Sequence, residues 1–508
     1  MKQTLKLGLT LSAMAFLTAC GTGGAQSASG GGTPAAAPPA TLTGGANGGA
    51  VAEAPLSISW MTILHTAAPP TDYVINRIEA ATNTNLEFLW VPDASRQERM
   101  TTALAAQELG DIVTFTQLQD TTMINAMEAG MFWELTDKLD YFPNLSQISE
   151  ARRRTASREG RLYGVPLERW ATRRGFTLRQ DWLDNLGLEV PTTMDELFEV
   201  ARAFTTEDTF GFIGRTAFID MSFANTLTMF GGPNRWRLND DGTFTHAFET
   251  THWVENMQWW RAIVEGGYIN PDFLTTPTSD QNQLFAQGRG GMYPNLTNIG
   301  LLRDLSQGMH GDDFALVPVN RISRGDGNYG IIAENNGVGG LLSIPRTNVQ
   351  TEEHLMQILA FIDRLFDYDV HMYITGGVRG THWDYTEEGA FEVIDTQRWQ
   401  EDVQPLGQNV ASVVRIVPLH AHPEMAHRDR LFLDNEEIVV MNPAIGLNSP
   451  TFNERGSTLE QAVHDVTVQY IMGVATMANF EAALETFRNN GGRQIAQEFE
   501  ESNRRFNQ

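Results

Sequence analysis

The sequence predicts an α/β fold, in which helices cover the faces of mostly parallel sheets. Between residues 56 and 130, short runs typical of strands alternate with stretches whose apolar residues recur at helical spacing. This β-α-β-α-β-α order favours parallel pairing, because a strand that returns in the same direction needs a crossover helix. Two Ser/Thr-x-x-Glu patterns, Ser95–Glu98 and Thr193–Glu196, indicate capping boxes at helix starts.

The N-terminal elements follow from alternation and capping. Strands are expected over 56–60, 86–91 and 111–115, with a loop over 61–70. Thr71 can cap a helix whose apolar residues within 74–81 share one face. A second helix begins at Ser95, and a third covers 123–129 and ends at Gly130.

Residues 160–204 predict a crossing segment, a strand and two helices. The run Leu-Tyr-Gly-Val-Pro at 162–166 is extended, because its glycine and proline oppose a helix. Residues 176–179 have the composition of a strand, and 181–186 begin a helix that Gly187 ends. After Thr193, apolar residues at i, i+3, i+4 and i+7 predict one buried face of a longer helix.

The later chain continues the same alternation and then becomes mainly helical from about residue 400. Asn-Asp-Asp-Gly at 239–242 is typical of a hairpin turn. The remaining strands are expected over 290–293, 314–319, 329–332 and 337–344. The remaining helices are expected over 253–264, 353–366, 457–472, 480–487 and 494–506.

Composition excludes several classes of protein. The chain of 508 residues is long enough for two or more domains, and its formal charge of −26 disfavours nucleic acid and anionic membranes as partners. The single cysteine, Cys20, excludes an intrachain disulfide and a cysteine-based zinc site.

The N-terminus predicts a lipoprotein signal peptide over 1–20. Lys2 and Lys6 precede an apolar run that is too short to anchor as a membrane span, and Leu-Thr-Ala-Cys at 17–20 matches a bacterial lipobox. Cys20 is therefore the expected lipidation site, and acyl chains would hold the protein stably on a membrane. Residues 21–50 are rich in Gly, Ala, Ser and Pro and predict a disordered tether.

The order of elements within 160–204, together with Leu-Tyr-Gly-Val-Pro and Arg-Gln-Asp-Trp-Leu, resembles a known family. This is the extracellular solute-binding proteins of ABC importers, family 1 (maltose-binding-protein-like), in their long lipoprotein branch from Gram-positive bacteria. The resemblance implies a two-lobed periplasmic-binding-protein-like fold of type II, in which mixed, mostly parallel sheets are flanked by helices and a mainly helical region closes the chain. The first lobe would comprise 51–165 and 331–400, and the second 166–330 and 401–508.

Motifs for catalysis and metal binding are weak. The sequence lacks His-Glu-x-x-His, Gly-x-Ser-x-Gly and the phosphate-binding Gly-x-x-x-x-Gly-Lys-Ser/Thr. His420, His422 and Glu424 could form a ligand cluster, and the acidic turn at 239–242 could suggest calcium, but plain surface and a plain turn explain both. Neither a metal nor a cofactor is expected.

A sugar-binding cleft needs aromatic rings for pyranose faces and paired polar groups for hydroxyls. Trp182 and Trp260 are expected to serve packing, and Tyr163 could do either. The ligand-binding candidates near strand ends and crossings in the family's fold are Trp60, His65, Phe115, Trp170, Arg173, Tyr293, Asn295, Tyr329, Asn335, Arg379 and Trp383.

The expected function is that of a lipid-anchored, monomeric receptor on the extracellular face of the cell membrane. The resemblance implies that it captures a solute, for which an oligosaccharide is the first expectation, by hinge closure and delivers it to ABC permease subunits. Two alternatives remain open: a secreted lipoprotein enzyme acting on polysaccharide, and a ligand-binding subunit of a sensory system. The enzyme would need two opposed carboxylates with shifted pKa values in the cleft.

Overall fold

The computed structural model describes residues 54–506 except 117, 119, 312–313, 388 and 408–421. The signal peptide, Cys20, the tether and His420 lie outside these residues. A five-stranded sheet, in the order β2-β1-β3-β12-β4, forms the centre of the first lobe. Its strands are β1 (Leu56–Leu64), β2 (Thr84–Pro92), β3 (Ile112–Phe115), β4 (Val165–Glu168) and β12 (Val338–Ser343).

A four-stranded sheet, in the order β10-β5-β9-β6, forms the centre of the second lobe. Its strands are β5 (Phe176–Arg179), β6 (Phe210–Phe212), β9 (Gly290–Tyr293) and β10 (Leu316–Val319). Three two-stranded sheets pair β7 (Trp236–Leu238) with β8 (Phe244–His246), β11 (Ile331–Ile332) with β15 (Val439–Val440), and β13 (Trp383–Tyr385) with β14 (Phe391–Val393).

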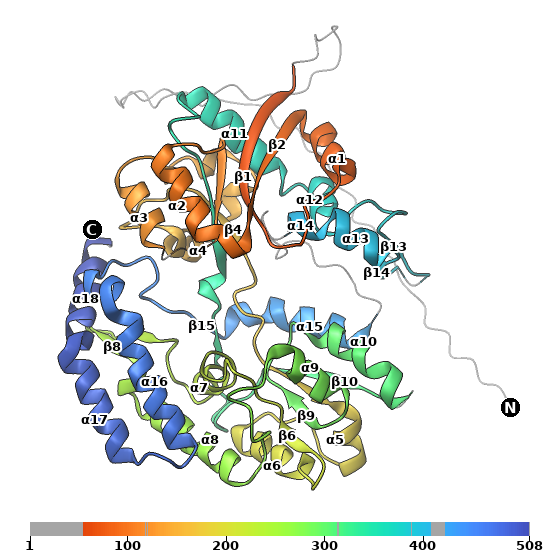
Figure 1. Ribbon diagram of the computed structural model, residues 1–508, viewed down its shortest axis with the longest axis vertical. Helices are drawn as coiled ribbons and strands as arrows, with labels where there is room; N and C mark the ends of the chain where they lie inside the picture. Colours follow the sequence, from red (N-terminus) through yellow and green to blue (C-terminus); the bar gives the residue numbers. More distant parts are fainter. Residues whose placement is uncertain are drawn as a thin grey trace, which may run out of the picture. The chain divides into compact units, whose positions relative to one another are not determined.

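Helices cover both main sheets (Figure 1). The first lobe carries α1 (Asp72–Thr82), α2 (Arg96–Ala106), α3 (Thr121–Glu128), α4 (Glu150–Ala156), α11 (Glu352–Arg364), α12 (Tyr368–Thr375), α13 (Thr396–Asp402) and α14 (Gln404–Gly407). The second carries α5 (Gln180–Leu186), α6 (Met194–Phe204), α7 (Ala224–Met229), α8 (Thr251–Glu265), α9 (Thr278–Ala286), α10 (Ile299–His310), α15 (Pro423–Asp434), α16 (Ser457–Ile471), α17 (Met477–Phe487) and α18 (Arg493–Phe506). No helix within the described ranges is both long and apolar enough to cross a membrane.

Short 3-10 or π turns join these elements. They are η1 (Asp93–Ser95), η2 (Leu139–Tyr141), η3 (Leu145–Gln147), η4 (Ile219–Phe223), η5 (Ala247–Glu249), η6 (Asn335–Gly337), η7 (Asn435–Glu437), η8 (Phe452–Gly456) and η9 (Arg488–Gly492).

The two sheets have separate apolar cores. One core draws its buried side chains from 58–167 and 338–406, and the other from 176–331 and 463–487. Each core is assembled from segments far apart in sequence, because the chain leaves the first sheet after β4 and returns to it in β12. The apolar positions predicted for the helix after Thr193 are all buried in the second core.

Both sheets are mixed, but antiparallel pairs are as frequent as parallel ones in the first sheet and more frequent in the second. The β1 strand is parallel to β2 and β3, as the strand–helix alternation predicts. The β12 strand is antiparallel to β3 and β4, because it enters the sheet from the other lobe. In the second sheet only β6 and β9 are parallel.

Of the helix caps predicted at Thr71, Ser95 and Thr193, the first and the third are confirmed. Thr193 and Glu196 form the expected capping box, and the Thr71 side chain caps α1. The box predicted at Ser95 is wrong: Ser95 ends a 3-10 turn, and its side chain makes no cap bond. The loop predicted from residue 61 is also wrong over 61–64, since β1 continues to Leu64 and pairs with β2 throughout.

Candidate functional site

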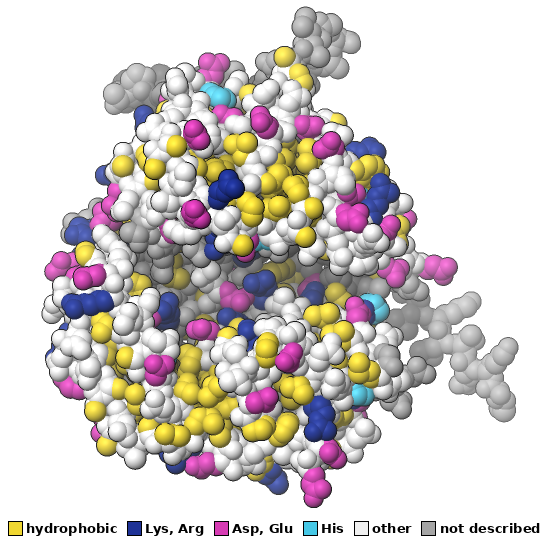
Figure 2. Space-filling model, in the orientation of Figure 1, with side chains coloured by type: hydrophobic (Ala, Val, Ile, Leu, Met, Phe, Trp, Pro, Cys, Tyr) yellow, Lys and Arg dark blue, Asp and Glu magenta, His cyan; other side chains and the backbone are white. Residues whose placement is uncertain are grey.

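A cleft of about 820 Å³ lies where the two lobes meet. Thr116, Leu118 and Asp120 line it from the first lobe, just beyond the end of β3. Val338, the first residue of β12, also lines it from the first lobe, and the second lobe and the crossing segments supply the other residues. Figure 2 shows a hollow across the molecule with basic and acidic side chains inside it. The charged lining side chains are Asp120, Arg173, Arg174, Asp220, Arg235, Glu334 and Glu460.

Two chain segments cross between the lobes side by side at one edge of this cleft. The first runs from β4 to β5 and the second from β11 to β12. The Arg169 backbone N–H donates to the Gly337 carbonyl at 2.9 Å, and the Glu334 N–H donates to the Ala171 carbonyl at 2.8 Å. Backbone hydrogen bonds therefore tie the two crossings together.

The second crossing contains three consecutive residues in the left-handed region. Asn335, Asn336 and Gly337 have φ values of 47°, 50° and 75°. Asparagine and glycine adopt this region at the lowest cost. The Asn336 side chain also exchanges hydrogen bonds with the backbone of Asn442, accepting from its N–H at 2.9 Å and donating to its carbonyl at 2.9 Å. The conformation that places Asn335 on the cleft is thus held by contacts from the second lobe.

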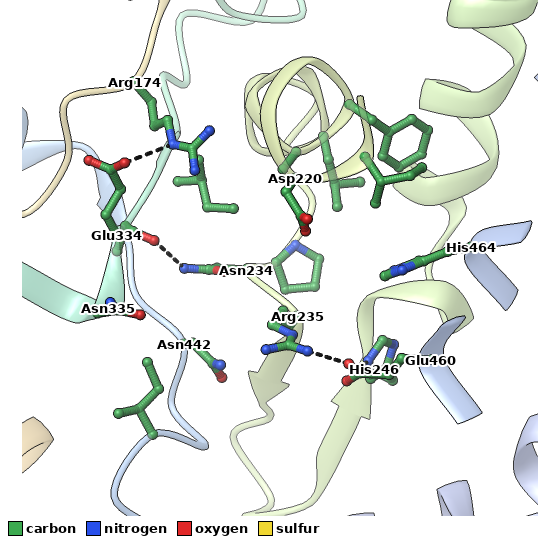
Figure 3. A pocket seen from close by; sticks show the side chains of 18 of the residues that line it. Arg174, Asp220, Asn234, Arg235, His246, Glu334, Asn335, Asn442, Glu460 and His464 are labelled. Atoms are coloured by element: carbon green, nitrogen blue, oxygen red, sulfur yellow. Dashed lines mark hydrogen bonds and ion pairs between the residues drawn. The ribbon is translucent and has the colours of Figure 1, made fainter. Parts of the chain in front are cut away.

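Glu334 connects the crossings through its side chain (Figure 3). Its Oε2 accepts from the backbone N–H of Arg173 at 3.0 Å and from Arg173 Nε at 3.1 Å, and its Oε1 lies 3.1 Å from Arg174 Nε. Burial raises the pKa of Glu334, but Arg173 and Arg174 outweigh burial, so the net pKa lies below its ordinary value. Glu334 is therefore ionised and fixes the direction of both arginines.

Glu460 of α16 is a second carboxylate in the lining of the cleft. Its Oε2 pairs with Arg235 and its Oε1 lies 3.2 Å from His246 Nε2. Because His246 Nδ1 accepts the Phe248 N–H at 3.2 Å, the imidazole proton resides on Nε2 and is donated to Glu460. Burial raises the pKa of Glu460, but the His246 hydrogen bond and the Arg235 charge together lower it to about 2.

Aromatic rings form the inner apolar wall. Phe223, Phe248 and Trp253 line the cleft and are buried, and Trp253 lies at 4.7 Å from both phenylalanine ring centroids. His464 of α16 stacks on Trp253 with an angle of 9° between their ring planes. Burial lowers the pKa of His464, as it does that of His246. Both histidines are thereby favoured in the neutral form.

Asparagines and one aspartate complete the polar lining. Asn234 donates through Nδ2 to the carbonyls of Ala333 and Val440, both at 3.1 Å. The Asp220 side chain points toward the opening, near Arg235 and Asn234 (Figure 3). Asp220 is exposed, and within the described part of the chain its side chain makes no hydrogen bond or ion pair. It remains open to accept hydrogen bonds from a bound molecule.

Two of the sequence-predicted ligand residues, Arg173 and Asn335, line this cleft. Tyr329 lies instead on a separate groove of about 390 Å³, where 39% of it is exposed. His65 lies 3.7 Å from Asp93, and Arg379 pairs with Asp384 at 2.8 Å. Ligand contact stays a prediction for all of these residues.

The predicted aromatic candidates are mostly inside the lobes. Trp60 is 1% exposed and its Nε1 donates to Thr114 at 2.8 Å, while Phe115 packs edge-on against Phe132. Trp170 packs on Phe432.

Three candidates from later in the chain also make contacts with other residues of the protein. The Tyr293 hydroxyl donates to Asn282, the buried Trp383 donates to the Gly377 carbonyl, and Asn295 accepts the Thr297 N–H at 2.5 Å. These aromatic candidates are buried because large rings contribute most to stability when they pack in a core.

Sequence reasoning missed most of the cleft. Asp220, Asn234, Arg235, Glu460 and His464 come from three separate segments and carry no shared motif. A weak signal existed only at Gly-Gly-Pro-Asn-Arg, 231–235, where glycine and proline interrupt the pattern after a helix.

No group of three or more His, Cys, Asp or Glu among the described residues could hold a metal ion. Glu424 faces Arg303, with Oε1 3.6 Å from Nη1. In the acidic turn, Asp241 accepts from the N–H and hydroxyl of Thr243 at 3.0 and 2.6 Å, which closes the hairpin. The carboxylates with displaced pKa values in the cleft, Glu334 and Glu460, both have lowered values, unlike the raised value of a general acid.

Residues 64–367 match the family model described as bacterial extracellular solute-binding protein. The chain is 37% identical over 470 residues to the polygalacturonan/rhamnogalacturonan-binding protein YtcQ of Bacillus subtilis (strain 168), covering 90% of this chain and 93% of YtcQ. It is 24% identical over 439 residues to the lipoprotein LipO of the same organism, covering 83% of this chain and 86% of LipO.

Solved structures share the fold. A solute-binding protein associated with an HMO-binding ABC transporter of Bifidobacterium longum infantis superposes with a TM-score of 0.63 at 17% identity, over 89% of this chain and 99% of that one. The N-glycan transport protein NgtS of Streptococcus pneumoniae superposes with a TM-score of 0.64 at 15% identity, with the same coverage of 89% and 99%.

Proposed function

Because this chain belongs to the family of bacterial extracellular solute-binding proteins, we propose that its cleft captures an oligosaccharide and presents it to the permease of an ABC importer. The observation that carries this proposal is the cleft itself, which residues of both lobes line. A ligand in the cleft contacts both lobes. Among the described residues, the lobes are joined by the crossing from β4 to β5 and the crossing from β11 to β12. Residues 51–165 with 331–400, and 166–330 with 401–508, are the proposed moving units.

Hinge closure is the proposed mechanism. A ligand shifts the open–closed equilibrium only by binding the closed arrangement more tightly, so its contacts must span both lobes. The crossings at Arg169–Arg174 and Ala333–Gly337 can absorb the rotation, since their backbone φ and ψ angles can change while the sheets stay intact. Asn335, which lines the cleft from within one crossing, links ligand contact to the hinge.

The lining suits an oligosaccharide. Asparagine, aspartate and arginine side chains of the lining can donate to and accept from adjacent hydroxyls. The names of YtcQ and NgtS, which refer to polygalacturonan and to N-glycan transport, agree with a saccharide ligand.

Lipidation of Cys20 and a tether over 21–50 are part of the same proposal. An anchored receptor stays near its permease, and the tether lets the folded body reach it as a monomer. Labelling with a fatty-acid analogue, compared between the native chain and Cys20→Ser, tests the anchor. Equal labelling of both would contradict it.

Titration calorimetry of the purified protein against neutral and acidic oligosaccharides tests the ligand class. At least one saccharide should bind with unchanged mass after incubation, and Asp220→Asn should weaken that binding about tenfold through loss of a charged acceptor. Asp241→Asn, in the hairpin turn outside the cleft lining, serves as the matched control. If no saccharide binds, or if the bound saccharide is cleaved, the proposal is wrong.

A further inference from the structure

Two half-exposed arginines distinguish the cleft from one built only for hydroxyl groups. The Arg173 side chain is 45% exposed and that of Arg235 is 47% exposed, and both line the cleft. They come from different parts of the second lobe: Arg173 lies on the first crossing and Arg235 precedes β7.

Each arginine is held by a carboxylate whose two oxygens both contact protein side chains. Glu334 uses one oxygen on Arg173 and the other on Arg174, and Glu460 uses one on Arg235 and the other on His246. Both carboxylates are inside the wall, with side-chain exposures of 23% and 5%. Both carboxylates line the cleft, and each fixes the direction of its arginine.

The outer N–H groups of both arginines remain available. Arg173 donates to Glu334 through Nε, and within the described residues its Nη1 and Nη2 meet no protein acceptor. Arg235 uses Nη2 on Glu460, and its Nε and Nη1 likewise meet none there. The free Nη1 and Nη2 of Arg173 form a fork of two parallel donors, which matches the two oxygens of a carboxylate, whereas the free Nε and Nη1 of Arg235 lie on different edges of the guanidinium and each donates singly.

The remaining charge in the opening restricts where such a carboxylate can lie. Asp220 is exposed on the same cleft and would repel a second anion beside it. It suits sugar hydroxyls, which donate. The cleft thus offers two arginines to anions, while Asp220 and the second lining aspartate, Asp120, can accept from hydroxyl donors.

From this arrangement we infer that the ligand is an acidic oligosaccharide, whose uronate carboxylates are bound by Arg173 and Arg235 while its hydroxyls donate to Asp220. The inference rests on the proposed function and specifies its substrate class. Arg174 has a different role, because its side chain is only 14% exposed and contacts Glu334 and the Met221 sulfur.

The test compares hexagalacturonate with its fully methyl-esterified form, which has the same rings without the charges. Calorimetry with the purified full-length chain should show binding of the acid and at least about 100-fold weaker binding of the ester, as expected for loss of charge-assisted hydrogen bonds. Arg173→Gln and Arg235→Gln should each weaken binding of the acid about 10-fold or more and leave any binding of the ester unchanged.

Two further variants serve as controls. Arg237→Gln changes an arginine two positions from Arg235 that lines the other groove, and it should bind hexagalacturonate as the native chain does. Arg173→Lys keeps the charge but loses the fork, and it should fall between native and Arg173→Gln. Melting temperatures of all variants identify any that fail to fold.

The outcomes separate the two proposals. Equal binding of acid and ester, or binding of a neutral oligosaccharide alone, overturns the acidic-ligand inference and leaves the oligosaccharide receptor standing. Binding of the acid that is insensitive to both arginine variants overturns the residue assignment. If no saccharide of either kind binds, the proposed function itself fails.

Discussion

Glu334 accepts hydrogen bonds from both the backbone N–H and the Nε of Arg173, a residue 161 positions earlier in the chain. The two residues lie on the two crossings between the lobes that the described residues form. One carboxylate therefore sets the spacing of the crossings and the direction of an arginine on the cleft.

Replacing Glu334 by Gln should weaken both folding and binding. Arg173 and Arg174 would then face each other without the charge between them, and we expect a loss of about 1–3 kcal/mol in the free energy of unfolding. Denaturant titration measures this loss. Glu352→Gln, which breaks an exposed pair with Lys138, should cost less than about 1 kcal/mol. A Glu334→Gln variant as stable as this control would contradict the positioning role.

Acid should destabilise the second lobe in two steps. Burial lowers the pKa of His246, so the unfolded chain binds this proton more readily and stability falls as the pH drops below about 6.5. Glu460, with a pKa of about 2 against an ordinary 4.5, contributes stability above pH 4.5 that is lost as the pH falls toward 2. The second contribution is on the order of 3 kcal/mol.

Unfolding free energies of native protein and Glu460→Gln between pH 7 and pH 3 check this dependence. The variant should be less stable at pH 7 and should lose less stability below pH 4.5. Glu454→Gln, an exposed change nearby, should follow the native curve. Parallel curves for the native chain and Glu460→Gln would show that Glu460 does not titrate differently on folding.

The C-terminal helix should couple energetically to the first lobe. The guanidinium of Arg154 in α4 lies 4.4 Å from the ring centroid of Phe506 in α18. A double-mutant cycle with Arg154→Ala and Phe506→Ala should give a coupling energy of about 0.5–1 kcal/mol in the free energy of unfolding. The Arg261–Tyr470 pair, at 4.9 Å within the second lobe, supplies a comparison cycle. A coupling energy of zero for Arg154 and Phe506 would show that their contact contributes nothing.

Gly340 should not tolerate a side chain. Its φ is 147°, and an added Cβ would lie 1.9 Å from the Phe115 carbonyl oxygen, at the irregular register of β12. Gly340→Ala should therefore destabilise by more than about 3 kcal/mol or prevent folding. Gly325→Ala has a positive φ but open space around it, and should cost only about 1 kcal/mol. Circular dichroism melts of both variants check the difference, and similar melting temperatures would contradict it.

Local patterns in the sequence predicted much of the fold. The capping box at Thr193 and the strand over 176–179 depend on neighbouring residues alone, and both have the predicted bounds. The failure at Ser95 has a local cause that the pattern does not contain, since a 3-10 turn takes the place of the cap. The missed end of β1 has a distant cause, because pairing with β2 extends the strand through residues that resemble a loop.

The candidate site was less predictable. Arg173 and Asn335 lie on the crossings, whose position the family resemblance implies, and both line the cleft. The aromatic candidates failed to gather there because apolar rings at strand ends are as well suited to the core, where Trp60 and Tyr293 are found. The spacing of aromatic residues in the sequence does not distinguish a ring that packs in the core from a ring that binds a ligand.

The sequence by itself determined the α/β class, the alternation of elements and, by resemblance, the family. These properties depend on periodicity, capping and short motifs, which act between near neighbours. Only the tertiary structure decided that Arg235, Glu460 and His246 meet, and that Glu334 holds two arginines across the hinge. Electrostatic recognition requires charges within a few ångströms of one another in space, and their distance along the chain carries no information about that.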